Sequence, residues 1–395
     1  GFREPAIYYL LAKDPKYLHA AERNYQTVMG LYGQFPGGGF GADEVCRPGY
    51  TDPRQGFETC SMVEFMHSFE MLARISGDPV WADRCEEIAF NSLPAALTAD
   101  GKALHYLTGA NMPQLDKENK APGIMNSGTM LSFSPFAVYR CCQHNVSHGW
   151  PYYAEECWLA TSDRGLCAML YADTRVKAHV GSGAGHPVAV TVETNYPFDE
   201  TVTFRLELSE PTAFPLYLRI PRWCSQPVVA VVGEAATVRG RPGAYFKLER
   251  TWKPGDQVRL SLPMQLGVRS WPKNQQSVSV DYGPLTFSLK IDEAYQRYGG
   301  TDAWPAELLL WSAPDRKTLA DRLAALQVAL QSTAKIALRD LAASLAARWQ
   351  NADERLALVA KDRQDLLARL PAVVAFLRGE AKALPPAVQL RSGAP

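Results

Sequence analysis

The sequence LLAKDPKY at residues 10–17 returns in altered form as MLARISGDPVW at residues 71–81. In both copies an apolar segment runs into an Asp-Pro turn, and an aromatic residue and a charged stretch follow. Aspartate before a helix and proline in its first turn are common signals of a helix start. The repeated unit is therefore predicted to be a hairpin of two helices. Repeated hairpins are typical of solenoids and of closed αα-toroids.

Working outward from this repeat, we expect residues 1–160 to form a helical domain. The segment 34–54 interrupts the pattern, because it is rich in glycine and proline. It is predicted to be a long loop, and long loops on a helical scaffold are frequently functional.

The sequence changes character twice after residue 160. Residues 161–307 are predicted to form an antiparallel β-sandwich, because short runs rich in Val, Leu and Phe alternate with Gly, Pro and Asp turns. These runs are 188–194, 201–208, 216–220, 228–232, 245–249 and 258–262. Residues 308–395 are rich in Ala, Leu, Arg and Asp, and we expect a helical tail with helices at 318–331, 336–349 and 361–377. The abrupt shift suggests a separate, fused segment, and the fold class is α+β multidomain.

Composition excludes several partners. The 395 residues include 41 basic and 41 acidic side chains, and this balance gives no electrostatic case for nucleic acid or anionic membrane. No apolar run reaches the roughly 18 residues that a membrane span needs. The eight cysteines are scattered rather than arranged as a disulfide framework. A reducing, cytoplasmic location is therefore expected, although the chain opens with glycine rather than methionine.

Two short stretches carry most of the chemistry, Glu58-Thr59-Cys60 and Cys141-Cys142. One carboxylate and three thiolates suit a tetrahedral zinc ion. Residues at i and i+2 share a face only in extended chain, so we expect the first stretch to lie at the end of the loop, before a helix that starts near Ser61. The adjacent pair can reach one ion only at a bend, such as a loop-to-helix junction. The residues alone leave open a structural zinc, a catalytic zinc-thiolate and cysteines without metal.

From residue 1 to about 290 the chain resembles glycoside hydrolase family 127, the β-L-arabinofuranosidase family. The resemblance rests on GGFGADE at residues 38–44 and on the two cysteine stretches, which together are a specific combination. Supporting matches are the helix with Gly77-Asp78 and Asn91, and LRIPRW at residues 218–223.

The resemblance implies a retaining glycoside hydrolase that acts on β-L-arabinofuranosides or a related sugar, with a glycoside as its binding partner. Its fold would be an (α/α)6 barrel followed by a β-sandwich, and this chain is expected to begin within the barrel. The family ligands correspond to Glu58, Cys60, Cys141 and Cys142 for zinc, with Cys141 as the nucleophile and Glu44 as the general acid/base.

Glu86 and Tyr106 match positions that touch the sugar in the family, and His144, beside the cysteine pair, is a further candidate for binding substrate. Each has a plain alternative from its sequence context. Glu44 could be a solvated loop carboxylate. Glu86 could be an exposed helix residue, Tyr106 a packed aromatic and His144 a helix cap.

The tail from about residue 311 resembles the linker after the ketosynthase of modular polyketide synthases. Two hypotheses therefore stand beside the hydrolase. One is a carbohydrate-binding or structural toroid protein with a structural zinc, or an inactive fragment of the enzyme. The other is an assembly-line linker whose function lies in the tail.

Overall fold

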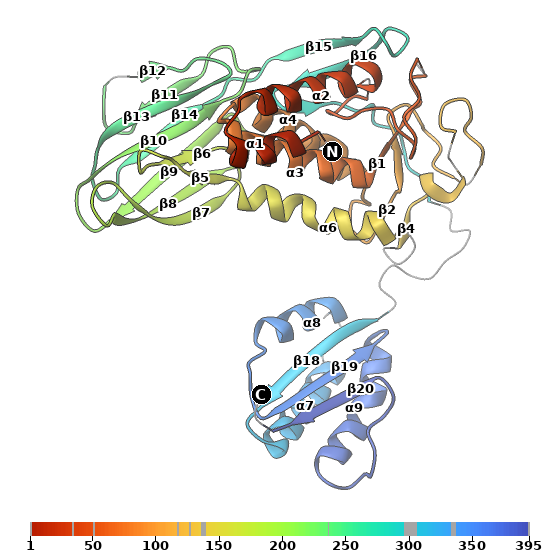
Figure 1. Cartoon of the computed structure of the whole chain (residues 1–395). Helices are drawn as coiled ribbons and strands as arrows, with labels where there is room; N and C mark the ends of the chain where they lie inside the picture. The colour runs from red at the N-terminus through yellow and green to blue at the C-terminus, as the bar shows by residue number, and fades with distance from the viewer. Residues whose placement is uncertain are drawn as a thin grey trace. The chain divides into compact units, whose positions relative to one another are not determined.

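The computed structural model describes residues 2–33, 35–49, 52–116, 118–125, 128–135, 140–235, 237–295, 306–332 and 337–393. The chain divides into two compact units, Gly1–Tyr298 and Gly299–Pro395 (Figure 1). It is an α+β multidomain protein, as the sequence predicts. Within the described residues no helix is both long and apolar enough to cross a membrane.

The repeated sequence motif forms two helical hairpins, which confirms the first prediction. Helix α1 ends before Lys13, whose left-handed backbone closes it, and α2 starts directly after Pro15. In the second copy Gly77 closes α3, and the Asp78 side chain accepts a hydrogen bond from Val80 N at 3.0 Å to start α4. The helical elements of this unit are α1 (Glu4–Ala12), α2 (Lys16–Tyr32), α3 (Thr59–Ser76), α4 (Pro79–Glu87), the π-helix η1 (Ile88–Ser92), α5 (Leu93–Ala95), the 3-10 helix η2 (Gly128–Leu131) and α6 (Arg140–Glu155).

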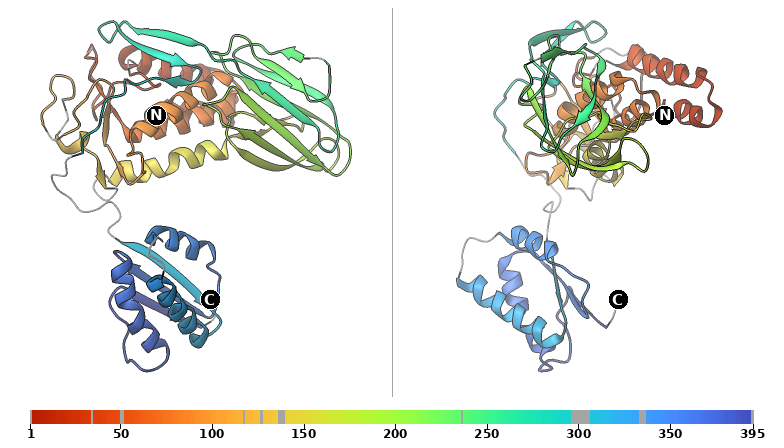
Figure 2. Two further views of the ribbon diagram at one scale, coloured as in Figure 1. Left: turned by 180° about the vertical axis from the view of Figure 1, so that it is seen from behind. Right: turned by 90° about the vertical axis from the view of Figure 1, so that its left-hand side faces the viewer.

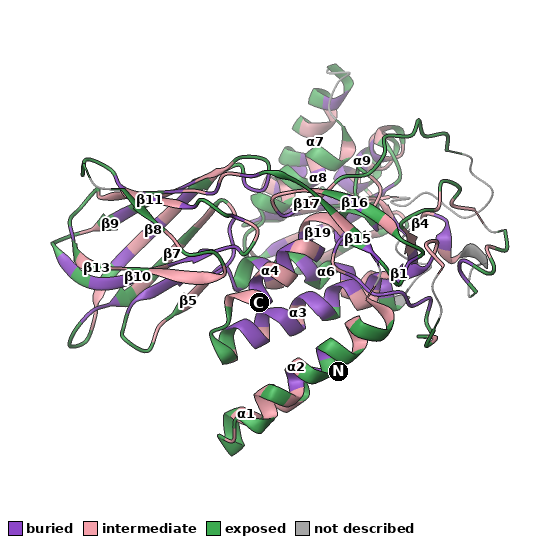
Figure 3. Cartoon of the chain, turned by 90° about the horizontal axis from the view of Figure 1, so that it is seen from above, coloured by how far each residue is buried: buried purple, intermediate pink, exposed green. Residues whose placement is uncertain are grey.

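Helix α3 is the centre of the helical part. It packs against α1, α4 and α6, and more than half of its residues are buried, among them Phe65, Met66 and Phe69 (Figure 3). By contrast α1 buries only Ala6 and exposes much of its surface. Because α3 starts at the Glu58-Thr59-Cys60 stretch, its rigid packing fixes the position of that stretch.

The helical prediction for residues 1–160 is incomplete, because short strands lie among the helices. They are β1 (Gly56–Glu58), β2 (Ala103–Leu104), β3 (Leu107–Gly109) and β4 (Ser134–Pro135). Strand β1 pairs antiparallel with β3, and β2 pairs with β4. These pairs join segments about 50 and about 30 residues apart in sequence, so a local pattern does not reveal them.

The strands after α6 form sheets that lie beside the helices in unit 1 (Figures 1 and 2). One sheet has the order β13-β10-β6-β5, a second has the order β12-β11-β14-β9-β8-β7, and a third has the order β15-β16-β17. The strands are β5 (Trp158–Ala160), β6 (Leu166–Ala168), β7 (Thr174–Val180), β8 (His186–Thr194), β9 (Thr201–Leu208), β10 (Thr212–Ile220), β11 (Val228–Val231), β12 (Thr237–Arg239), β13 (Ala244–Trp252), β14 (Gln257–Ser261), β15 (Leu266–Trp271), β16 (Ser277–Tyr282) and β17 (Leu285–Thr286).

The first two sheets share one hydrophobic core. Alternate side chains of β8 and β9, such as Val190 and Phe204, are buried with Leu216 and Leu218 of β10. The runs predicted as strands all coincide with β8, β9, β10, β11, β13 and β14. The expected purely antiparallel pairing is wrong at one place, because β6 and β10 pair in parallel. The chain leaves the first sheet after β6 and forms β7, β8 and β9 of the second before it returns as β10.

The second unit is not the helical tail that the sequence predicts. It contains an antiparallel sheet of order β18-β19-β20 together with helices and has its own core. Burial alternates along β19, from buried Leu356 and Leu358 to exposed Val359, which is the two-residue period of a strand. The expected helices are present close to the predicted bounds. The elements are β18 (Glu307–Ala313), α7 (Arg316–Ser332), α8 (Leu338–Ala347), β19 (Glu354–Ala360), α9 (Arg363–Leu377) and β20 (Val388–Ser392).

Candidate metal centre

Glu58 and Cys60 lie where β1 ends and α3 begins. Glu58 is the extended N-cap of α3, with φ −74° and ψ 136°, so the backbone changes from strand to helix between the two residues. Thr59, between them, is buried, and its hydroxyl donates to His105 O at 2.8 Å while its N–H donates to Tyr106 O at 3.0 Å. The predicted junction at the end of the loop is present, but the helix starts at Thr59 rather than near Ser61. Cys60 therefore lies in the first turn of α3 and not, as expected, in extended chain with Glu58.

The cysteine pair lies in the first turn of α6. Cys142 is buried, and its sulfur lies 3.4 Å from the sulfur of Cys60. Cys141 is exposed, and its sulfur lies 4.0 Å from that of Cys142. Because α3 and α6 pack against each other, their first turns bring residues 82 positions apart into contact.

The side chains of Glu58, Cys60, Cys141 and Cys142 form one cluster whose four ligand atoms all lie within 4.8 Å of one another. In the part of the chain that the structure describes, no other set of three or more His, Cys, Asp and Glu gathers in this way. A carboxylate and three sulfurs at this spacing could hold a metal ion.

Electrostatics favour a cation at this cluster. Burial raises the pKa of the Glu58 carboxyl, and the nearby charge of Glu44 adds to the effect. The adjacent Cys142 thiol, and then burial, raise the pKa of the Cys60 thiol far above its usual range. Burial and then Cys60 likewise raise the pKa of the Cys141 thiol. Glu58, Cys60 and Cys141 are thus harder to ionise than usual, and a bound cation would reverse this by stabilising their negative forms.

Glu44 reaches the edge of the cluster from the glycine-rich loop. Its backbone has a φ of 78°, in the left-handed region, and the side chain is exposed. The Tyr106 hydroxyl donates a hydrogen bond to Glu44 Oε1 and lies 3.5 Å from the Cys141 sulfur. Tyr106 thus contacts both residues to which the family resemblance gives catalytic roles.

The structure does not bring Glu86 to this cluster, and its burial on α4 contradicts the predicted contact with a sugar. Its side chain is 1% exposed on α4, where Oε1 forms an ion pair with Arg219 of β10. Its other oxygen accepts from the Tyr196 hydroxyl at 2.7 Å. Arg219 also pairs with Asp83, one turn earlier on α4. A buried carboxylate with these partners joins the helices to the sheets and cannot touch a ligand in solvent.

His144 follows Cys141 by three residues on α6, which places both on one helix face. Its side chain is exposed, so its role in binding substrate stays a prediction. Another residue beside the cluster, Asn145, was not predicted from the sequence. The Asn145 side chain bonds to the Cys60 thiol and opposes the rise in its pKa. Its i+3 spacing from Cys142 was the available signal, since it puts both on the same face of the helix.

The fold and the cluster define a multidomain protein with a thiolate-rich candidate metal centre. Residues 2–155 match the family model described as "Beta-L-arabinofuranosidase, GH127 catalytic domain", and residues 165–264 match "Beta-L-arabinofuranosidase, GH127 middle domain". Over these residues, which include the whole cluster, the chain belongs to glycoside hydrolase family 127.

Solved structures of the same fold agree with this assignment. A protein described as a glycoside hydrolase is 20% identical, with a TM-score of 0.60, and the match covers 72% of this chain and 50% of that one. A GH127 beta-L-arabinofuranosidase from Geobacillus stearothermophilus is 23% identical with a TM-score of 0.59, covering 72% and 45%. A GH127 beta-arabinofuranosidase is 20% identical with a TM-score of 0.59, covering 72% and 46%. The chain thus spans about half the length of these proteins. No curated protein matches it.

Proposed function

We propose that this protein is a retaining glycoside hydrolase that uses a zinc-bound thiolate and acts on β-L-arabinofuranosides or a related sugar. The observation that carries the proposal is the convergence of Glu58, Cys60, Cys141 and Cys142 within 4.8 Å, with Glu44 reaching the same place through Tyr106. The two family matches and the substrates named for the related structures support the choice of sugar.

The finer architecture belongs to the same proposal. We infer that the hairpins α1–α2 and α3–α4, together with α6, form part of an (α/α)6 catalytic barrel. The first two sheets form a β-sandwich beside it, as their shared core suggests.

The donor set fits zinc. Two sulfurs on one tetrahedral zinc ion lie roughly 3.8 Å apart, given Zn–S bonds of about 2.3 Å. The observed sulfur separations of 3.4 and 4.0 Å lie on either side of that value. Glu58, Cys60, Cys141 and Cys142 would hold the ion. When bound, it supplies the positive charge that keeps the cysteines as thiolates near neutral pH.

Exposure distinguishes the roles of the cysteines. Cys142 is buried and Cys60 half-buried, whereas Cys141 is exposed and therefore accessible to a sugar. In the first step the Cys141 sulfur forms a bond to the anomeric carbon as the glycosidic C–O bond breaks, and Glu44 gives its proton to the leaving oxygen. In the second step a water molecule loses a proton to Glu44 and adds to the same carbon. The C–S bond breaks, and the thiolate returns.

A Cys141→Ser variant tests the proposal. We expect it to keep its fold and to lose turnover of an aryl β-L-arabinofuranoside, because the serine hydroxyl is a far weaker nucleophile than a thiolate. Cys46→Ser is the matched control, since Cys46 is also exposed but lies outside the cluster. Turnover by Cys141→Ser equal to that of the parent contradicts the thiolate mechanism.

A second candidate function is a carbohydrate-binding or structural protein in which the metal only joins α3 to α6. The burial of Cys142 and the half-burial of Glu58 favour it, because a structural metal site is closed. The same assay separates the two functions. A purely structural site predicts metal binding by the parent protein without turnover of any glycoside.

A further inference from the structure

The backbone of Glu44 adopts an unusual conformation that needs support. Its φ of 78° lies in the left-handed region, where a residue with a Cβ is strained by roughly 1 kcal/mol or more. Such a conformation persists only where neighbouring contacts enforce it. The residues on either side of Glu44 supply those contacts.

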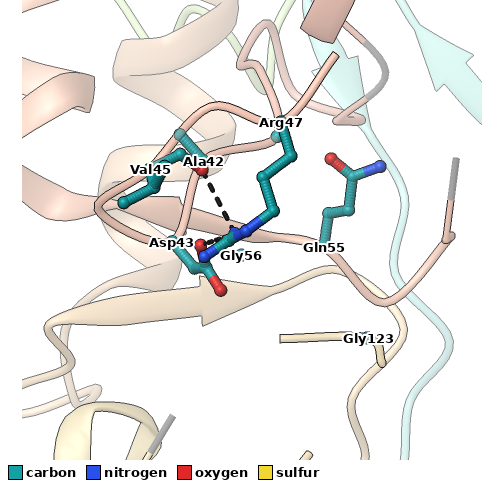
Figure 4. A pocket seen from close by; sticks show the side chains of 8 residues that line it. Ala42, Asp43, Val45, Arg47, Gln55, Gly56 and Gly123 are labelled. Carbon is teal, nitrogen blue, oxygen red and sulfur yellow. Dashed lines mark hydrogen bonds and ion pairs between the residues drawn. The ribbon is translucent and has the colours of Figure 1, made fainter. Parts of the chain in front are cut away.

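Asp43, directly before Glu44, is 4% exposed and held at both carboxylate oxygens. Oδ1 accepts a hydrogen bond and forms an ion pair with the Arg47 guanidinium, and Oδ2 accepts from Met125 N at 2.6 Å. The same guanidinium nitrogen of Arg47 also donates to Val45 O at 3.2 Å. Arg47 therefore bonds to the residue before Glu44 and to the residue after it (Figure 4).

The loop is also fastened to the strand that leads into the cluster. Ala42 N donates to Gly56 O at 2.8 Å, and Ala42 forms a parallel bridge with Phe57 of β1. Strand β1 ends at Glu58. One continuous set of contacts therefore runs from the cluster through β1 to Ala42 and Asp43. These contacts fix the position of the Glu44 backbone, from which its carboxylate projects.

The space around this pair is too small to be a ligand site. The hollow lined by Asp43, Arg47 and Gln55 holds only about 10 Å³, which is at most the space of one water molecule (Figure 4). The buried Asp43 carboxylate already bonds to a guanidinium and a backbone amide through its two oxygens, so its effect is to hold the backbone of this loop in place.

We propose that Asp43 and Arg47 are positioning residues, which together hold Glu44 in its left-handed conformation so that its carboxylate faces Tyr106 and Cys141. The proposal rests on the role of Glu44 as acid/base in the proposed function. A displacement of about 1 Å of a catalytic group can cost on the order of 100-fold in rate, so this pair has a large effect without touching substrate.

The test compares substrates that differ in their need for a proton. Asp43→Asn and Arg47→Lys are expected to lower kcat/KM for an alkyl β-L-arabinofuranoside by roughly 10- to 100-fold. For the dinitrophenyl glycoside, whose leaving group departs without a proton, the loss is expected to stay within about threefold. Arg369→Lys is the matched control, since Arg369 forms an i,i+4 ion pair with Asp365 in the other unit. Equal losses on both substrates indicate general damage to the fold and overturn the proposal.

A double-mutant cycle gives a readout that a structural role would not move. In a Glu44→Gln background, Asp43→Asn is expected to cause no further loss on the alkyl glycoside, because the group that it positions is already gone. Additive losses overturn the positioning role.

A crystal structure of the Asp43→Asn variant tests the positioning role without an activity assay. The positioning role predicts that Glu44 leaves its left-handed conformation and its contact with Tyr106, while Cys60 and Cys142 stay in place. An unchanged Glu44 overturns it. Absence of turnover by the parent protein contradicts the proposed function instead, so the two failures are distinct.

Discussion

Replacing Arg219 with methionine removes the only positively charged side chain that the described residues place in an ion pair with the Glu86 carboxylate. Arg219 is fully buried and forms ion pairs with Asp83 and Glu86 and a hydrogen bond to Met169 O. In the variant, Asp83 keeps Arg222, whose Nε lies 3.2 Å from Oδ2. Glu86, at 1% exposure, keeps only the hydroxyls of tyrosines.

The size of the effect follows from that difference. Breaking a buried pair by removing one partner costs about 3 to 5 kcal/mol, mostly through the charge that stays behind. Neutralising that charge should therefore restore most of the loss. The double variant Arg219→Met/Glu86→Gln is expected to be destabilised by only about 1 to 2 kcal/mol, because no unpaired charge is left on α4.

Amide hydrogen exchange in increasing urea measures this in the intact chain. Peptides from α4 and β10 report the free energy of opening at the junction, and peptides from β18 and β19 in the second unit serve as an internal control. A cost below about 1 kcal/mol for Arg219→Met, or no recovery in the double variant, refutes the reasoning. So does a Glu86→Gln variant with parental stability and a raised KM, since it would place Glu86 at the sugar after all.

Burial raises the pKa of the Glu70 carboxyl on α3 from 4.5 to about 8, so ionisation of this group lowers the stability of unit 1 as the pH rises between these two values. The Glu70→Gln variant should therefore be more stable than the parent by about 3 kcal/mol at neutral pH and by little at pH 4. The midpoints of urea unfolding at the two pH values measure this difference. His105 has the opposite pH dependence. Burial lowers its pKa from 6.5 to about 4, so stability should fall by about 3 kcal/mol as the pH drops from 6.5 to 4, and a His105→Gln variant that keeps the same slope would contradict this. Removal of metal by a chelator should slow the alkylation of the exposed Cys141, because burial and Cys60 raise the pKa of its free thiol, whereas Cys46 should react equally with or without metal. An equal alkylation rate of Cys141 in both states would argue against a bound ion.

The parts of the fold that could be predicted from the sequence are those determined by neighbouring residues. The Asp-Pro turns contain residues that favour a helix start, and the apolar residues of β8 and β9 alternate with the two-residue period of a strand. The helical hairpins and these strands were therefore predicted. Strand β19 was missed because ERLALVA consists largely of residues that also favour helices, and only pairing with β18 and β20 decides the outcome.

The site shows the same division. Glu58, Cys60, Cys141 and Cys142 were found because their residue types limit what they can bind. The error at Glu86 has a long-range cause, since its partner Arg219 lies 133 residues later on β10. The support of Glu44 by Asp43 and Arg47 was missed because Met125, the third member, comes from a distant loop.

The central claim is that the Cys141 sulfur forms a covalent bond to the sugar. The direct measurement is peptide mass spectrometry of a Glu44→Gln variant mixed with the dinitrophenyl β-L-arabinofuranoside. The good leaving group permits the first step, and loss of the carboxylate slows the second, so the intermediate accumulates. The account predicts one arabinosyl group on the peptide that contains Cys141, with fragmentation placing it on Cys141 and not on Cys142. An arabinosyl group on Glu58, or steady turnover with no labelled cysteine, would contradict it.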